Sequence, residues 1–168
     1  MPAFLISLLA RQLVVLEHKG FVALHPNVAA WLVWEPGNWV SPRSELELNT
    51  GITRFPVLAR PEAPEEGDAL CFALLANEYG DDDRLKIGRA LECDIILNDM
   101  TVSREQFELH HCEGYWAALS SVGATTFVGE VEASRAIALR DQALIRIGGL
   151  RLTFYRPEGF LERLRVSL

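Results

Sequence analysis

The stretch from Leu85 to Phe107 constrains this chain most strongly. Its residues are LKIGRALECDIILNDMTVSREQF. The pattern predicts a short strand that ends at Gly88–Arg89, a loop, and an apolar run from Asp94 to Leu97. A polar turn follows, and Val102–Ser103–Arg104 then leads into another strand. Two separate turns of a β-rich fold therefore each present an arginine, and the second turn adds a serine hydroxyl.

These side chains suit one kind of ligand. The planar guanidinium groups of Arg89 and Arg104, beside the Ser103 hydroxyl and backbone donors, match a tetrahedral oxyanion such as phosphate. Loops that carry arginine capture phosphorylated peptides in a recurring mode of recognition. The sequence therefore predicts an anion-binding site on these two turns.

The order of the motifs resembles the forkhead-associated (FHA) domain, a module that binds phosphothreonine peptides. The resemblance is carried by three segments: Ile-Gly-Arg (87–89), Cys-Asp-Ile-Ile-Leu-Asn-Asp (93–99) and Val-Ser-Arg-Glu-Gln-Phe (102–107). It continues from Trp116 to Val128 and from Leu139 to Gly148, and covers roughly residues 67–156. It implies a mainly β protein, an antiparallel β-sandwich of the FHA type, with an N-terminal helix-containing extension and a short C-terminal helix.

The resemblance also implies roles for individual residues. Arg89 corresponds to the arginine that reaches the phosphate, and Ser103 to the serine that donates to it. Arg104 stands where the family often supplies a further contact to peptide or phosphate. Gly123 keeps the neighbouring turn flexible.

Two positions depart from the family pattern. Gln106 replaces a histidine that braces the binding loop, although a glutamine amide can also bridge backbone groups. The family's Asn-Gly-Thr turn aligns with Ala124-Thr125-Thr126, and alanine cannot make the amide contact by which the asparagine holds the peptide. Thr125 offers partial compensation through a shorter hydroxyl. Two hypotheses remain open: a weakened phosphothreonine-binding module, or a degenerate FHA scaffold that assembles with proteins independently of phosphate.

We divide the chain into an extension and linker (1–66), the FHA domain (67–156) and a C-terminal helix (157–168). Periodicity predicts a helix from Ala3 to about Glu17, although Leu13–Leu16 also suits a strand. In the first half of the chain we also expect a buried strand at 29–34, a proline- and acid-rich linker at 41–68, a strand at 69–75 and an acidic turn at 77–83. In the second half we expect a hairpin of 107–112 with 115–120, and another of 143–147 with 150–155 around Gly148–Gly149. A helix is expected from Pro157.

The apolar N-terminal segment contains Trp31, Trp34 and Trp39. One interpretation is that they pack against the neighbouring sandwich. The alternative is a docking face that forms a homo-oligomer, because aromatic clusters are enriched at interfaces.

Composition excludes several classes of protein. Hydrophobic residues make up 49% of the 168 residues, which is typical of a globular chain, and the net charge of −7 argues against a nucleic-acid partner.

Cys71, Cys93 and Cys112 form no Cys-x-x-Cys pair. No apolar run reaches the length of about 18 residues that a membrane helix needs. We expect a cytoplasmic protein with reduced thiols and no membrane partner.

We expect neither a metal, a cofactor nor catalysis. His110, His111 and Cys112 are adjacent on a strand and cannot converge on one ion, and Asp81–Asp83 lacks the spacing of a calcium loop. Ser103 has no activating group at motif spacing, and no glycine-rich phosphate loop is present. The expected partner is a phosphothreonine-containing protein or peptide, such as a Ser/Thr kinase or its substrate.

Overall fold

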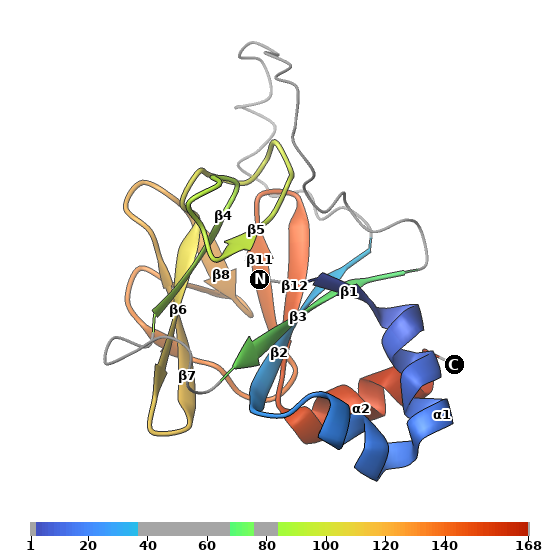
Figure 1. Ribbon diagram of the computed structural model, residues 1–168. Coiled ribbons are helices and arrows are strands. Elements are labelled where there is room, and N and C mark those ends of the chain that lie inside the picture. The colour runs from blue at the N-terminus through green and yellow to red at the C-terminus, as the bar shows by residue number, and fades with distance from the viewer. Residues whose placement is uncertain (1–2, 37–67, 76–83, 168) are drawn as a thin grey trace.

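The computed structural model describes residues 3–36, 68–75 and 84–167. Within these residues, two β-sheets lie face to face and two helices lie on one side of them (Figure 1). The larger sheet has seven strands in the order β1-β3-β2-β12-β11-β8-β9, and the smaller has five in the order β10-β7-β6-β4-β5. Neighbouring strands are antiparallel except for β4 and β5, which are parallel. The predicted mainly β, antiparallel sandwich is confirmed.

Along the chain, the first three strands lie in the larger sheet and the next four in the smaller, after which β8 and β9 return to the larger sheet, β10 to the smaller, and β11 and β12 to the larger. Their bounds are β1 Ala3–Leu5, α1 Ile6–Leu24, β2 Val28–Glu35, β3 Leu70–Leu75, β4 Arg84–Gly88, β5 Ile95–Ile96, β6 Phe107–Cys112, β7 Tyr115–Ser120, β8 Thr126–Val128, β9 Val131–Glu132, β10 Ile137–Ala138, β11 Ala143–Ile147, β12 Leu150–Tyr155 and α2 Pro157–Val166.

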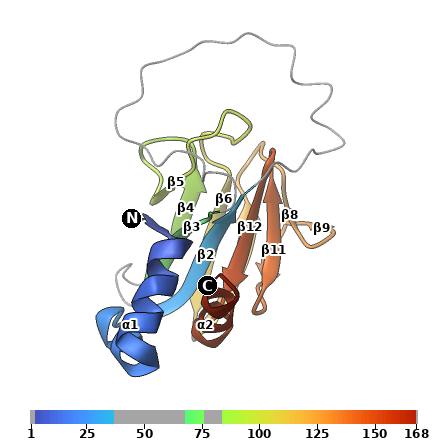
Figure 2. The same ribbon diagram turned by 90° about the vertical axis from the view of Figure 1, so that its right-hand side faces the viewer.

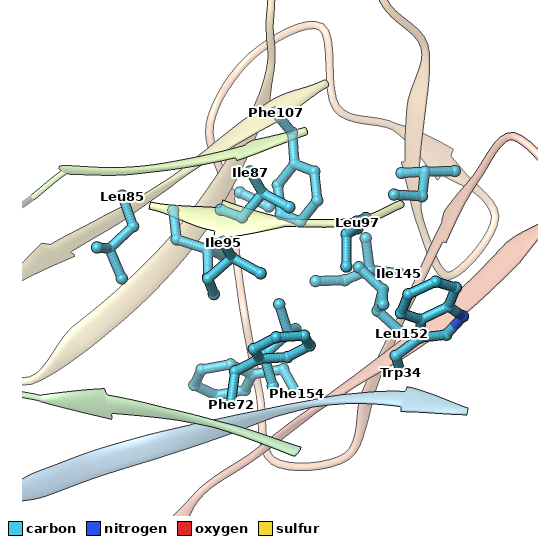
Figure 3. Packing of buried hydrophobic residues seen from close by; sticks show 14 of the residues in the cluster. Trp34, Phe72, Leu85, Ile87, Ile95, Leu97, Phe107, Ile145, Leu152 and Phe154 are labelled. Carbon is cyan, nitrogen blue, oxygen red and sulfur yellow. The ribbon is translucent and has the colours of Figure 1, made fainter. Parts of the chain in front are cut away.

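The main core lies between the two sheets. Strand β4 shows why, since Leu85 and Ile87 are buried while Arg84 and Lys86, at the alternate positions, are exposed. Figure 3 shows side chains of both sheets pointing into this core, among them Trp34, Phe72, Leu85, Ile87, Ile95, Leu97, Phe107, Ile145, Leu152 and Phe154. Burial of these side chains fixes which face of each strand points inward.

The outer face of the larger sheet is covered by α1 and α2, which lie side by side (Figure 2). A second apolar cluster fills this layer, and in it Trp31 stacks on Phe160 with ring centroids 4.3 Å apart. Strand β2 is therefore buried on both faces, which explains its nearly continuous apolar run. Trp31 and Trp34 are 2% and 1% exposed, so they pack within the chain. Trp39 lies outside the described residues.

The N-terminal segment differs from our expectation in two ways. Ala3–Leu5 forms strand β1, paired with Leu70–Phe72 of β3, so the predicted helical start at Ala3 is wrong. Pairing with a sheet edge has overridden the local helical pattern there. The helix is real, and its non-helical residue Glu17 marks the predicted end, but helical structure resumes and reaches Leu24. Strand β2, which we expected to pack on the sandwich, lies within the larger sheet between β3 and β12.

Both helices begin at a carboxylate from a distant part of the chain. Asp68 accepts hydrogen bonds from the Ser7 backbone N–H (3.2 Å) and hydroxyl (2.7 Å) at the start of α1. Asp141 accepts one from the Arg156 N–H (2.7 Å) before α2. Such contacts satisfy N–H groups that a helix leaves open. The rest of the predicted linker (41–67) and the acidic turn (77–83) lie outside the described residues.

The two predicted hairpins are confirmed. Glu113 and Gly114 connect β6 to β7 with φ values of 49° and 81°, as expected for a tight two-residue turn. Gly148 and Gly149 connect β11 to β12. The C-terminal helix is also confirmed, with Pro157 in its first turn. Neither described helix has the length and apolar character that crossing a membrane requires.

Candidate functional site

Gly88 lies where the two loops of the predicted site approach each other closely. The Arg89 N–H donates to the Ser103 carbonyl, and the Ala90 N–H to the Arg104 carbonyl, each at 2.9 Å. A Cβ atom at Gly88 would lie 2.3 Å from the Arg104 carbonyl oxygen. The close approach of the two loops therefore requires glycine at this position.

The Arg89 side chain is held by the opposite loop. It is half-buried, and its Nε donates to the Val102 carbonyl at 3.2 Å. A guanidinium group has five N–H donors, so this bond fixes its direction and leaves the terminal N–H groups for a ligand.

Gln106 connects the Ser103 loop to the loop that follows β7. Its buried side-chain oxygen accepts from the Ser103 N–H at 2.9 Å. Its amide nitrogen donates to the Thr125 carbonyl at 2.8 Å and to the Thr126 hydroxyl at 3.3 Å. Gln106 thus bridges backbone groups as we expected of a glutamine at this position.

Two adjoining pockets open between these loops. The larger, of about 430 Å³, is lined by Ala90, Glu92, Ser103, Arg104, Glu105, Val122, Gly123 and Ala124. The smaller, of about 190 Å³, is lined by Arg89, Ala90, Leu91, Glu92 and Arg104. Arg104 belongs to both, and therefore connects Arg89 in one with Ser103 in the other.

Five of the six residues that we predicted for the site line these pockets. Thr125 is the exception, because it lines neither and its carbonyl is bonded to Gln106. Gly123 has a φ of 79°, in the region that favours glycine, and it closes the turn in which the Ala124 N–H donates to the Ser121 carbonyl at 3.0 Å.

Sequence analysis missed two carboxylates at the site, Glu92 and Glu105. Glu105 lies 3.7 Å from the Lys86 ammonium, and both side chains are about half exposed, at 54% and 49%. An anion site is recognised in a sequence by its cations and hydroxyls, and acidic residues carry no such signal. The position of Glu105 beside Arg104 was the one available indication.

The site offers oriented hydrogen-bond donors, and its positive and negative charges nearly balance. Arg89 and Arg104 bring two positive charges, and Glu92 and Glu105 bring two negative charges. An anion would therefore be held by oriented guanidinium and hydroxyl groups and not by an excess of positive charge. Within the described part of the chain, no group of His, Cys, Asp and Glu side chains is arranged to hold a metal ion.

Residues 85–148, from β4 to β11, match the family model of the FHA domain. The chain is similar in fold to an engineered FHA domain with a Myc-pTBD peptide, at 15% identity and a TM-score of 0.51, over 83% of this chain and 99% of that one. A structure from a study of phosphothreonine-dependent FHA domain interactions has 15% identity and a TM-score of 0.48, over 76% and 95%. The FHA domain of the CT664 protein from Chlamydia trachomatis has 14% identity and a TM-score of 0.45, over 76% and 97%.

No curated protein matches the chain. At identities of 14% and 15%, similarity to these solved structures shows the fold alone. The family model, in contrast, matches the sequence itself across both site loops. The match over residues 85–148, in the sandwich that these residues help to build, identifies this chain as a protein with an FHA domain.

Proposed function

We propose that this FHA domain binds peptides that contain phosphothreonine, and that Arg89 and Ser103 hold the phosphate. The observation that carries the proposal is the bond between the two loops, since the Arg89 N–H donates to the Ser103 carbonyl at 2.9 Å. The backbones of the arginine and the serine are therefore fixed next to each other before any ligand arrives. Such preorganisation lowers the entropic cost of binding.

Each of these groups has hydrogen-bonding capacity to offer. Within the described residues, the Ser103 hydroxyl and the terminal nitrogens of Arg89 make no hydrogen bond. A phosphothreonine carries between one and two negative charges near neutral pH and has three acceptor oxygens. Each charge-assisted contact to it contributes about 1.5–3 kcal/mol.

The hold on the peptide backbone is weaker than the hold on the phosphate in this proposal. Ala124 lines the larger pocket, and its methyl group can neither donate nor accept a hydrogen bond. Thr125 does not replace the missing amide, because it lies outside the pocket lining and its carbonyl is bonded to Gln106. We estimate the loss at about 0.5–1.5 kcal/mol, the net contribution of one hydrogen bond.

The partner class follows from this chemistry. We expect a phosphothreonine-containing protein, such as a Ser/Thr kinase or its substrate, and a role in binding without catalysis. Ala124 also supports a second candidate, in which the domain is a scaffold that assembles with proteins independently of phosphate.

The experiment that separates the two candidates is a titration of the purified chain with matched phosphothreonine, phosphoserine and unphosphorylated peptide pools, followed by fluorescence anisotropy. We expect binding to be confined to the phosphothreonine pool. In the Arg89→Ala variant, binding should weaken by about 2–4 kcal/mol because a charge partner of the phosphate is removed.

The matched control is Arg165→Ala, which removes an exposed arginine from α2 on the opposite side of the molecule (Figure 1). It should leave the affinity unchanged. Circular dichroism and thermal unfolding would verify that both variants are folded. Equal affinity of folded Arg89→Ala and the wild type would contradict the proposed site, and equal binding of all three pools would favour the scaffold.

A further inference from the structure

We propose that this site selects phosphopeptides that carry a basic side chain close to the phosphothreonine, and that Glu92 and Glu105 make this selection. The inference rests on the proposed function and specifies its substrate class. It depends on where the two carboxylates lie, how they are paired and which charges surround them.

Both carboxylates belong to the lining of the site. Glu92 lines both pockets, and Glu105 lines the larger pocket together with Ser103 and Arg104. A peptide whose phosphate reaches Arg89 and Ser103 must therefore bring its flanking residues past these two carboxylates. Val122 and Ala124, which line the same pocket, are apolar and offer no charged contact.

Within the described residues, neither carboxylate has a buried ionic partner. Glu92 is exposed and makes no ion pair within the described residues. Glu105 has Lys86 as a partner at 3.7 Å, but both side chains are about half exposed. Such a solvated pair contributes little, so a cation of the peptide can replace Lys86 at small cost.

The two carboxylates also contribute to the electrostatic field of the site. Burial raises the pKa of the nearby Cys93 thiol, a backbone hydrogen bond with Ala90 lowers it, and the negative charges of Glu105, Asp94 and Glu92 raise it. The carboxylates thus act together on the loop that separates Arg89 from Ser103. They offset the positive charge of Arg89 and Arg104, so a phosphate with acidic neighbours meets repulsion here, while one with basic neighbours finds complementary charge.

Ion pairs with the peptide would also compensate for the weak hold on its backbone. The site lacks the amide that would hold the peptide backbone, because Ala124 occupies that position. Ion pairs between flanking lysine or arginine and the two glutamates would supply part of the missing affinity. They would also add selectivity, since a like charge beside a carboxylate is rejected.

The test uses three phosphothreonine peptides that differ only in the flanking residues, which are lysine, alanine or glutamate. We expect the wild type to bind the lysine peptide roughly three- to tenfold more tightly than the alanine peptide, as one or two exposed charge pairs allow. The glutamate peptide should bind most weakly. The unphosphorylated lysine peptide measures attraction to the net charge of −7 alone.

The variants are Glu92→Gln, Glu105→Gln and the double variant, which keep the side-chain shape and remove the charge. The double variant should lose most of the preference for lysine and bind the glutamate peptide more tightly than the wild type does. The matched control Glu162→Gln removes an exposed carboxylate from α2 and should keep the preference.

The outcomes separate the two proposals. This inference would be overturned if binding depended on phosphate but showed no preference among the three flanking residues. It would also be overturned if the double variant kept the preference for lysine. In both cases the proposed function would stay intact. Absence of phosphate dependence with every peptide would overturn both.

Discussion

On the outer face of the larger sheet, polar side chains are paired with one another. At the loop end of the sandwich, several polar side chains are left exposed to solvent. Under the helices, Arg163 donates to Glu35 at 3.2 Å, and Asp68 accepts from both the backbone and the hydroxyl of Ser7. At the loop end, the Ser103 hydroxyl makes no hydrogen bond within the described residues. Glu92 makes no ion pair there.

This difference indicates a division of roles. The helix-covered face places apolar rings such as Trp31 and Phe160 in contact and pairs the polar groups around them. Its residues should contribute to the free energy of unfolding. The loop end keeps donors exposed on a rigid scaffold, as binding sites commonly do. Its exposed residues should contribute to binding and little to stability.

Trp31→Ala should destabilise the fold most. Trp31 is 2% exposed and stacks on Phe160, so its removal leaves a large cavity beneath both helices. We expect a loss of about 3–5 kcal/mol in the free energy of unfolding, measured with urea. The control is Val15→Ala on α1, which is 79% exposed and should change stability by less than about 0.5 kcal/mol. Loss of peptide affinity in folded Trp31→Ala would break the division.

Gln106→Leu should affect both stability and binding, because Gln106 is buried behind the site. The Ser103 N–H and the Thr125 carbonyl would lose their partner, at a cost of about 1–3 kcal/mol in stability. Phosphopeptide affinity should also fall, since the Ser103 loop would no longer be fixed. Gln106→His should restore part of both, because an imidazole can also accept and donate. A leucine variant with wild-type affinity would show that the bridge does not position Ser103.

Asp68→Ala should have the smallest effect, about 0.5–2 kcal/mol of stability, as for loss of a helix cap. Burial by itself raises the pKa of Asp68, but hydrogen bonds from Ser7, Ala69 and Ile6 outweigh it and lower the pKa below the ordinary value of 3.8. The unfolded chain therefore binds this proton more readily than the folded chain.

The sign of the pH dependence follows from that difference. The contribution of Asp68 is fully present above the unfolded pKa and is lost as the pH falls through the folded pKa. Asp68→Asn should keep most of the stability at neutral pH, because its carbonyl can still accept, but should lose this acid dependence. Urea unfolding between pH 2 and 7 would measure the stability and its pH dependence for each variant. If Asp68→Asn lost stability at acid pH as the wild type does, Asp68 would not be the group responsible.

Much of the fold could be predicted because local patterns agreed with the final packing. Alternating apolar residues in β4 and glycine turns at Gly114 and Gly148 need no distant partner to be recognised. The start of α1 could not be predicted, because Ala3–Leu5 is a strand only through pairing with Leu70–Phe72. Strand β2 was recognised as buried, but its place between β3 and β12 depends on pairing with segments far along the chain.

The FHA motif series and the chemistry of Arg89, Ser103 and Arg104 could be recognised without a structure, since these are properties of residue type and spacing. The folded chain was needed to find that Gln106 joins the Ser103 and Thr125 loops. It was also needed to find that Thr125 lies outside the pocket lining, whereas Glu92 and Glu105 lie within it. Burial, hydrogen bonding and charge balance arise between segments that folding brings together. Their separation along the chain does not encode those distances.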